Sequence, residues 1–147
     1  MSEHAPNFKD PTFTLSPQAN AYLRTQVMSA SPEELRMMLL DGAVKFATQG
    51  CEGLEAKDYE ASFAGFSRAR DIVLELMTTI RRDADPELAD RVRAVYAFIY
   101  QELVESSFEK DPVRGRKAVE LLDYERETWR LLMEQLGKKG ASARPAG

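Results

Sequence analysis

The sequence is poor in the residues that most reaction centres require. Its 147 residues include one cysteine, Cys51, and one histidine, His4. A single cysteine cannot form an internal disulfide, which is typical of a protein in a reducing compartment. One histidine near the N-terminus provides neither the Glu-x-x-His pairs of a di-iron bundle nor a helical histidine for phosphotransfer. Gly-rich phosphate loops and Cys-x-x-Cys motifs are also missing. We therefore expect no enzyme, no cofactor and no metal, although catalysis by carboxylates alone stays open.

The sequence also lacks an excess of positive charge and any long apolar run. It has 20 Lys and Arg against 24 Asp and Glu, and the basic residues are scattered among the acidic ones. This distribution does not favour binding of nucleic acid. No apolar run approaches the ~18 residues of a membrane span, and the first residues have no signal-peptide core. We therefore expect a cytoplasmic protein with no membrane insertion.

Glycine (8 residues) and proline (7 residues) are sparse, which favours long helices over many short strands. Several prolines follow a side chain that can cap a helix, so that proline occupies the first helical position. These helix-start signals are Ser31-Pro32, Asp85-Pro86 and Asp111-Pro112, and Asp58 provides a further cap. Apolar residues recur at helical spacing after each signal. The pattern predicts long helices over residues 32–56, 59–81, 86–110 and 112–137, after a short helix over about 17–28.

Long helices joined by connections of a few residues must lie antiparallel to their neighbours. The sequence therefore predicts an all-α protein, an antiparallel up-down four-helix bundle over residues 16–137, with a short N-terminal helix or arm packed against it. Residues 1–15 have no hydrophobic periodicity, and we expect them to be a disordered leader. We expect Gly137 to end the last helix and residues 138–147 to form a flexible tail.

The apolar stripes of the helices predict the core. Gly42 and Gly50 lie on the first stripe, where glycine weakens a helix by ~1 kcal/mol, so we expect them to permit close packing. Phe66 and Trp129 should be substantially buried. The stripe of helix 59–81 contains Phe63, Phe66, Ala69, Val73, Leu76, Met77 and Ile80. The stripe of helix 86–110 contains Leu88, Val92, Val95, Tyr96, Ile99 and Leu103, and that of helix 112–137 contains Ala118, Leu121, Leu122, Trp129, Leu132 and Leu136.

More apolar residues remain than these stripes can accommodate. The segment 21–28 is apolar but too short to be stable as an isolated helix, so we expect it to dock on the bundle. The remaining apolar residues either fill the flanks of helices or form grooves for amphipathic helices of a partner. The predicted partner-binding residues are Tyr22, Leu23, Val27, Met28, Met37, Leu40, Val44, Tyr100 and Val104. The wider set of apolar residues off the stripes adds Leu74, Phe108, Tyr124, Leu131 and Met133.

The stretch 20–46, NAYLRTQVMSASPEELRMMLLDGAVKF, carries the most distinctive residue order. It resembles the N-terminal signature of the FliS family of flagellar export chaperones, approximately AYxxTQVxTASPxxLxxMLYDGAxxFL, and a weaker likeness continues to Trp129. The matching residues are Ala21, Tyr22, Thr25, Gln26, Val27, Ala30, Ser31, Pro32, Leu35, Met38, Leu39, Asp41, Gly42, Ala43 and Phe46. The sequence departs from the family pattern at Leu40, where an aromatic residue is usual, and at 96–98, Tyr-Ala-Phe in place of a Tyr-Asp-Tyr-like signature.

The resemblance implies a function that composition could not supply. Members of this family bind the disordered C-terminal segment of flagellin in the cytoplasm, prevent its premature polymerisation and deliver it to the flagellar type III export gate. The resemblance also implies that Tyr22 belongs to an arm that caps part of the binding surface and takes part in ligand exchange. The alternative is a helical adaptor that binds another flagellar or secretion protein, including flagellar regulatory proteins.

Overall fold

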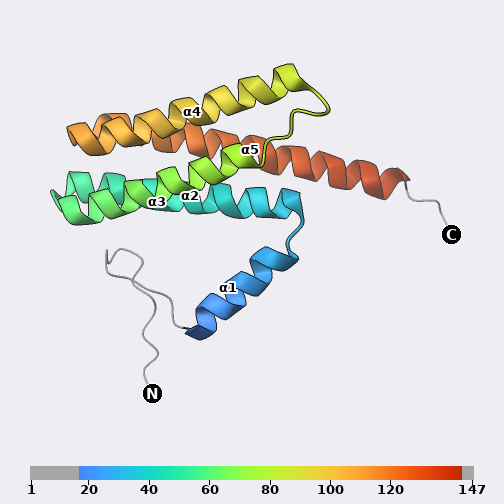
Figure 1. Ribbon diagram of the computed structural model, residues 1–147, viewed down its shortest axis with the longest axis horizontal. Coiled ribbons are helices and arrows are strands. Elements are labelled where there is room, and N and C mark those ends of the chain that lie inside the picture. Colours follow the sequence, from blue (N-terminus) through green and yellow to red (C-terminus); the bar gives the residue numbers. More distant parts are fainter. Residues whose placement is uncertain (1–16, 144–147) are drawn as a thin grey trace.

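The computed structural model describes residues 17–143, with side chains described as far as Lys138. The described chain is entirely helices and short connections (Figure 1). The helices are α1 (Pro17–Ser29), α2 (Pro32–Glu55), α3 (Tyr59–Thr78), α4 (Pro86–Glu109) and α5 (Pro112–Ala143). The predicted leader, residues 1–15, lies outside the described residues. None of the described helices combines the length and hydropathy needed to cross a membrane.

Side-chain caps start the long helices where the sequence predicts them. The Ser31 hydroxyl accepts a hydrogen bond from the Glu34 N–H at 3.1 Å, which satisfies one of the unpaired amides of the first turn of α2. Carboxylates of three aspartates do the same for the next helices. Asp58 accepts from the Ala61 N–H, Asp85 from the Leu88 N–H, and Asp111 from the Val113 and Arg114 N–H groups.

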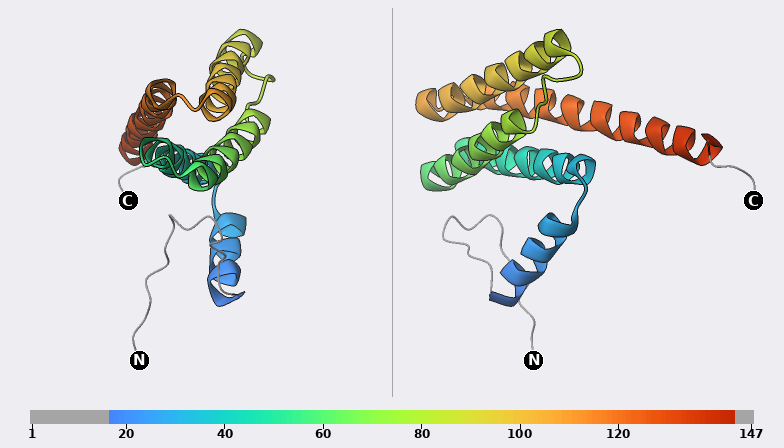
Figure 2. Two further views of the ribbon diagram at one scale, coloured as in Figure 1. Left: turned by 90° about the vertical axis from the view of Figure 1, so that its left-hand side faces the viewer. Right: turned by 45° about the vertical axis from the view of Figure 1, so that its right-hand side comes forward.

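The four long helices form the predicted antiparallel bundle. α2 packs on α3, α3 on α4, α4 on α5, and α5 on α2. Figure 2 shows this ring of helices in the view along their axes. The core between them consists of Leu40, Ala43, Ala47, Cys51, Leu54, Phe66, Ala69, Val73, Leu76, Tyr96, Ile99, Leu103, Ala118 and Leu122.

The closest contact in the bundle is the crossing of α2 and α3. A Cβ added to Gly65 would lie 2.5 Å from the backbone nitrogen of Gly50, and one added to Gly50 would lie 2.7 Å from Cγ of Phe66. At Gly42 the nearest atom, Cδ1 of Ile72, would be 3.2 Å away. The prediction that Gly42 and Gly50 permit close packing is therefore confirmed. The predicted burial of Phe66 is also confirmed, because its side chain is 0% exposed.

Some residues predicted to face the core are exposed instead. On α3 the small residue Ser62 is buried and the adjacent Phe63 points outward, because α2 approaches so closely that a Cβ on Gly53 would lie 2.5 Å from the Ser62 nitrogen. On α4 the small Ala89 is buried while Leu88 and Val95 are exposed. Hydropathy alone favours the larger side chain at such positions, whereas a close helix crossing selects the smaller one.

The last helix is longer than predicted. α5 continues through Gly137 to Ala143, so the prediction that Gly137 ends the helix is wrong. Glycine weakens a helix interior by ~1 kcal/mol but does not by itself end it. With 32 residues, α5 is about 48 Å long at 1.5 Å per residue and extends beyond the other helices (Figure 2). Leu132 and Leu136, which were predicted to be core residues, lie on this extension and are exposed.

The short N-terminal helix is present, but it does not dock as predicted. α1 has no buried residue, and Figures 1 and 2 show it angled away from the bundle. The bend at Ala30 and Ser31, between α1 and α2, sets this direction. Local hydrogen bonds support the isolated helix instead: Thr25 Oγ1 donates to the Ala21 carbonyl, and Ser29 Oγ donates to the Thr25 carbonyl.

Candidate partner-binding surfaces

The first candidate surface is the apolar side of α1, which we call the arm surface. It consists of Tyr22, Leu23, Val27 and Met28, all of them exposed and two of them strongly so, at 65% for Tyr22 and 80% for Met28. The Tyr22 hydroxyl accepts a hydrogen bond from Gln26 Nε2 at 3.1 Å, one helical turn away. The predicted binding residues of the arm are therefore gathered on one helix and accessible to a partner.

The remaining predicted residues are not brought together. Met37 and Val44 are half-buried on α2, on either side of Asp41, which pairs with Arg126 of α5 at 3.5 Å. Tyr100 and Val104 are half-buried on α4 and precede Ser107, which faces α3 beside Phe63. The two pairs lie on α2 and α4, which are not neighbours in the ring of helices. Their role in binding stays a prediction.

The structure corrects the prediction that Leu40 is a binding residue. Its side chain is 0% exposed and packs in the core with Ala43 and Ala47, which are three and seven residues further along α2. Helical periodicity places these three positions on one face. Leu40 is therefore not accessible to a partner, and its prediction as a binding residue is wrong.

A groove between α4 and α5 is the second candidate surface. This α4–α5 groove has a volume of about 430 Å³, and its lining residues are Phe98, Glu102, Lys117, Glu120, Leu121 and Tyr124. Phe98 is 56% exposed and Tyr124 is 69% exposed, so two aromatic rings border an apolar floor. A second hollow containing Val113 adjoins it and shares Lys117 and Glu120. The groove and this hollow together run along the outer face of α5, as expected of a site that binds an amphipathic helix.

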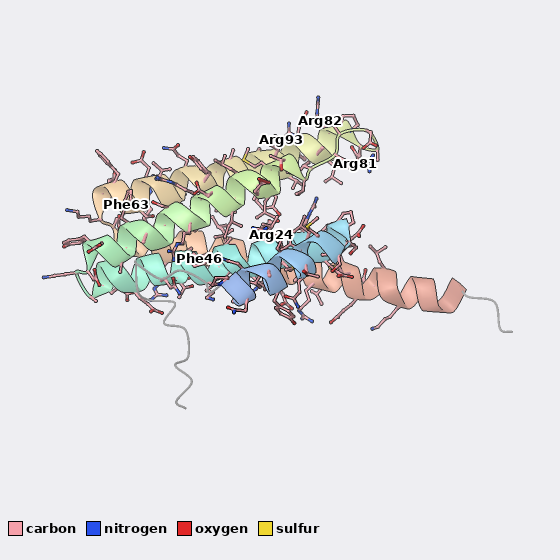
Figure 3. The ribbon with its side chains drawn as sticks, turned by 60° about the horizontal axis from the view of Figure 1, so that its bottom comes forward. Arg24, Phe46, Phe63, Arg81, Arg82 and Arg93 are labelled. Atoms are coloured by element: carbon pink, nitrogen blue, oxygen red, sulfur yellow. The ribbon has the colours of Figure 1, made fainter. Side chains whose placement is uncertain are left out.

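A smaller aromatic patch lies at the opposite end of the bundle from the α3–α4 connection. Tyr59 and Phe63 of α3 and the nearby Lys110 border a hollow of about 200 Å³. The Lys110 ammonium lies 4.5 Å from the centroid of the Tyr59 ring, a cation–π contact. Figure 3 shows Phe63 toward this end, and Arg81, Arg82 and Arg93 at the other. Arg81 and Arg82 pair with Asp83 and Asp90, so their charges are partly neutralised.

The third candidate surface, which we call the end cavity, opens where α2 begins, α3 ends and α4 begins. Its volume is about 410 Å³. The lining residues are Pro32, Glu33, Arg36, Thr79, Ile80, Arg81, Ala84, Asp85, Leu88, Ala89, Val92 and Trp129. The Arg36 guanidinium stacks over the Trp129 ring, with Cζ 4.4 Å from the ring centroid, and donates to the carbonyl and hydroxyl oxygens of Thr79. Trp129 itself packs against the core but is only half-buried, so the prediction that it is substantially buried is confirmed only in part.

The titratable groups between the helices are held by ion pairing or by burial in the bundle. Arg114 of α5 donates two hydrogen bonds to the Glu102 carboxylate of α4, which holds the pKa of that carboxyl below its usual range. Burial raises the pKa of Glu125 and raises that of Tyr96 to about 12. Burial also raises the pKa of Cys51 to about 11, so its thiol is protonated at neutral pH and is a poor nucleophile.

Sequence reasoning missed most of the α4–α5 groove and the end cavity. Tyr124 was recognised as lying off the core stripe, but Leu121 was assigned to the core and Phe98 was not assigned to a binding surface. Val95 and Phe98 lie three residues apart on α4 and so share one face, which the structure shows to be exposed although Val95 was assigned to the core. If the inward face of α4 had been assigned correctly, Val95 and Phe98 would both have been placed on its outer face.

Comparisons with known proteins identify the family to which the sequence is similar. The model of the family described as "Flagellar protein FliS" matches residues 15–136. The flagellar secretion chaperone FliS of Bacillus subtilis (strain 168) is 32% identical over 91 residues, which cover 62% of this chain and 67% of that protein. The flagellar secretion chaperone FliS of Vibrio cholerae serotype O1 is 20% identical over 105 residues, which cover 71% of this chain and 77% of that protein.

Proposed function

This chain belongs to the FliS family, and we propose that it is a cytoplasmic export chaperone for flagellin. In this proposal it binds the disordered C-terminal segment of flagellin, prevents premature polymerisation, and delivers the client to the flagellar type III export gate. It acts by binding alone. The observation that carries the proposal is the family match over residues 15–136, which contains α1 to α4 and all but the last seven residues of α5.

The exposed apolar surfaces support a client that lacks a fold of its own. Large apolar patches on a soluble protein usually mark interaction sites. The α4–α5 groove offers Phe98, Leu121 and Tyr124 from two neighbouring helices, which suits the apolar face of a helix laid between them. A disordered terminal segment would order as it fills the groove, because it buries apolar surface only in the complex.

The arm surface supports a second contact with the same client. Tyr22 and Met28 are exposed and are not docked on the bundle, so they are available to a bound segment without first being released. The bend at Ala30 and Ser31 separates α1 from α2, and α1 has no buried residue. We therefore assign Tyr22 a gripping role in which the arm closes over a segment that is already held by the bundle.

Calorimetry with a synthetic peptide covering the C-terminal segment of the flagellin from the same cell tests the proposal. Binding should be accompanied by a strongly negative heat-capacity change, because apolar surface is buried. Circular dichroism of the mixture should show more helix than the sum of its components. Absence of binding would contradict the flagellin proposal, and recovery of another flagellar protein by the same chaperone would favour an adaptor role instead.

A further inference from the structure

The part of α5 that extends beyond the bundle, residues 130–143, has an exposed apolar face. Leu132 and Leu136 lie four residues apart on this extension and are both exposed. They continue the side of α5 that carries the buried Leu122 and the half-buried Trp129. We propose that this face is the docking site of α1 when the arm closes over a client. The inference rests on the proposed function and gives the closed arm a defined position.

The helix α1 carries an apolar face that matches the one on the extension. Leu23 and Val27 lie four residues apart, so they share one side of α1. Tyr22 comes directly before Leu23, and Met28 comes directly after Val27. Each is therefore turned by about 100° from that side, and the two are turned in opposite directions. As a result, α1 can dock through Leu23 and Val27 while Tyr22 stays available to a client.

The two helices leave the bundle at the same end and are matched in length. Near the start of α2, the Arg36 guanidinium stacks on Trp129, the last residue of α5 before the extension. Figure 2 shows α1 and the extension at this end of the bundle, pointing in different directions. α1 has 13 residues and the extension, residues 130–143, has 14. At 1.5 Å per residue these are lengths of about 20 Å and 21 Å.

The connection between α1 and α2 has the properties of a hinge. Pro32 has no N–H, so the helical hydrogen bond that residue 32 would donate to the Met28 carbonyl cannot form. The Ala30 N–H donates to the Val27 carbonyl at 3.3 Å, and the Ser31 N–H donates to no backbone carbonyl of the described residues. Because α1 has no buried residue, rotation at this connection breaks no core contact.

The small size of the exposed face favours a tethered helix over a separate protein. Since α1 and the extension start from one end of the bundle, the closed pair is antiparallel, with Val27 on Leu132 and Leu23 on Leu136. Four apolar side chains bury far less area than a stable interface between separate proteins needs. A segment of the same chain has an effective concentration of millimolar order, so a weak contact is sufficient. We therefore assign this face to α1.

A client should shift α1 toward the docked position. In the free protein α1 has no buried residue, so the contact with the extension alone does not hold it. A client in the α4–α5 groove lies along the same helix as the extension, and Tyr22 reaches it only after the arm has closed. A ligand shifts a two-state equilibrium by its difference in affinity for the two states. Client binding and docking of α1 should therefore promote each other.

Disulfide formation in a protein with Leu23→Cys and Leu136→Cys tests the docked position directly. A peptide covering the flagellin C-terminal segment should accelerate the crosslink about 10-fold, because it raises the population of the closed arm. The native Cys51 should not react, since it is buried and burial raises the pKa of its thiol. The matched control combines Leu23→Cys with Lys138→Cys. Lys138 is exposed two residues further along α5, on the opposite side of the helix, so this crosslink should stay slow with and without the peptide.

Calorimetry with the same peptide provides a second measurement. A protein with Leu132→Ser and Leu136→Ser should bind about 10-fold more weakly, as expected for the loss of contacts of one to two leucine side chains. Leu74→Ser, at an exposed leucine on α3, is the control and should bind as the parent does. A crosslink that the bound peptide does not accelerate, whether slow or fast without it, would overturn the docking site and leave the chaperone function in place. If the peptide does not bind the parent protein, the flagellin proposal fails and the docking site fails with it.

Discussion

The two halves of the bundle are packed in contrasting ways. Between α2 and α3, small residues bring the backbones together, and a Cβ on Gly65 would meet the backbone of Gly50 at 2.5 Å. Between α4 and α5, large side chains such as Phe98 and Tyr124 remain exposed beside a groove of about 430 Å³. The first junction leaves no room for a ligand, whereas the second has apolar surface in excess of what the fold uses. We infer that α2 and α3 form the rigid scaffold and that α4, α5 and the arm surface form the binding side.

The largest expected effect is on stability, and it follows from removing a buried aromatic ring of the core. Phe66→Ala should lower the free energy of unfolding by about 3–5 kcal/mol, because Phe66 is fully buried beneath the α2–α3 crossing. Phe108→Ala is the matched control, since Phe108 is 84% exposed and its loss should change stability by less than about 0.5 kcal/mol. Urea denaturation of both variants measures the difference. Similar losses in the two proteins would contradict the division into scaffold and binding side.

The next effect concerns binding through the arm surface. Tyr22→Ala should weaken binding of the flagellin segment by about 2 kcal/mol or more if Tyr22 is a hot spot. Stability should stay near that of the parent, because Tyr22 is 65% exposed. Calorimetry measures the binding. Tyr59→Ala, an exposed tyrosine on α3, is the control and should bind normally. A Tyr22→Ala protein that binds as tightly as the parent would remove the gripping role.

A smaller effect should follow from filling the close crossing. Gly65→Ala should destabilise the fold by about 1–3 kcal/mol, because the added methyl group meets backbone atoms of α2 that cannot rotate away. Gly137→Ala serves as the opposite case, since a Cβ there has no neighbour within 4 Å, and it should stabilise α5 by up to about 1 kcal/mol. Thermal denaturation of the pair should move in opposite directions. A neutral Gly65→Ala would show that the crossing is looser than it appears.

The smallest predicted effect depends on pH. Burial raises the pKa of Glu125 above its value in the unfolded chain, so the folded state retains the proton longer as pH rises. The charged carboxylate therefore costs stability at neutral pH, and this cost disappears below the unfolded pKa. Glu125→Gln should stabilise the protein at pH 7, and the gain should vanish in acid. Denaturation across this pH range measures the difference, with Glu120→Gln, at an exposed position, as control. A Glu125→Gln protein that showed no pH-dependent gain in stability would contradict this account.

The sequence predicts the helices well and their packing less well, for physical reasons. Helix starts at Pro32, Tyr59, Pro86 and Pro112 depend on local caps, so they can be identified from a few residues. The inward faces of α3 and α4 depend on tertiary contacts that place Ser62 and Ala89 in the interior, against the order of hydropathy. The length of α5 is different: its end is exposed and a Cβ on Gly137 would have no neighbour within 4 Å, so tertiary contacts do not account for it.

The same distinction between local and tertiary signals explains which binding residues were predicted correctly. Tyr22, Leu23, Val27 and Met28 were found because they belong to a short apolar segment with a recognisable residue order. Leu40 was misassigned because the predicted stripe of 32–56 included Leu39 in its place, whereas Leu39 is half-buried and Leu40 is fully buried. The end cavity could not be predicted, because Arg36, Thr79 and Trp129 are far apart in the sequence and meet only at the end of the bundle.

The central claim is that the client binds the α4–α5 side and the arm surface rather than the α2–α3 side. Hydrogen–deuterium exchange of the protein with and without the flagellin C-terminal peptide tests this most directly. Binding should slow exchange in α1 and along α4 and α5 near Phe98 and Tyr124, and should leave the amides at the α2–α3 crossing unchanged. Protection confined to α2 and α3, with α1, α4 and α5 exchanging as in the free protein, would contradict the claim.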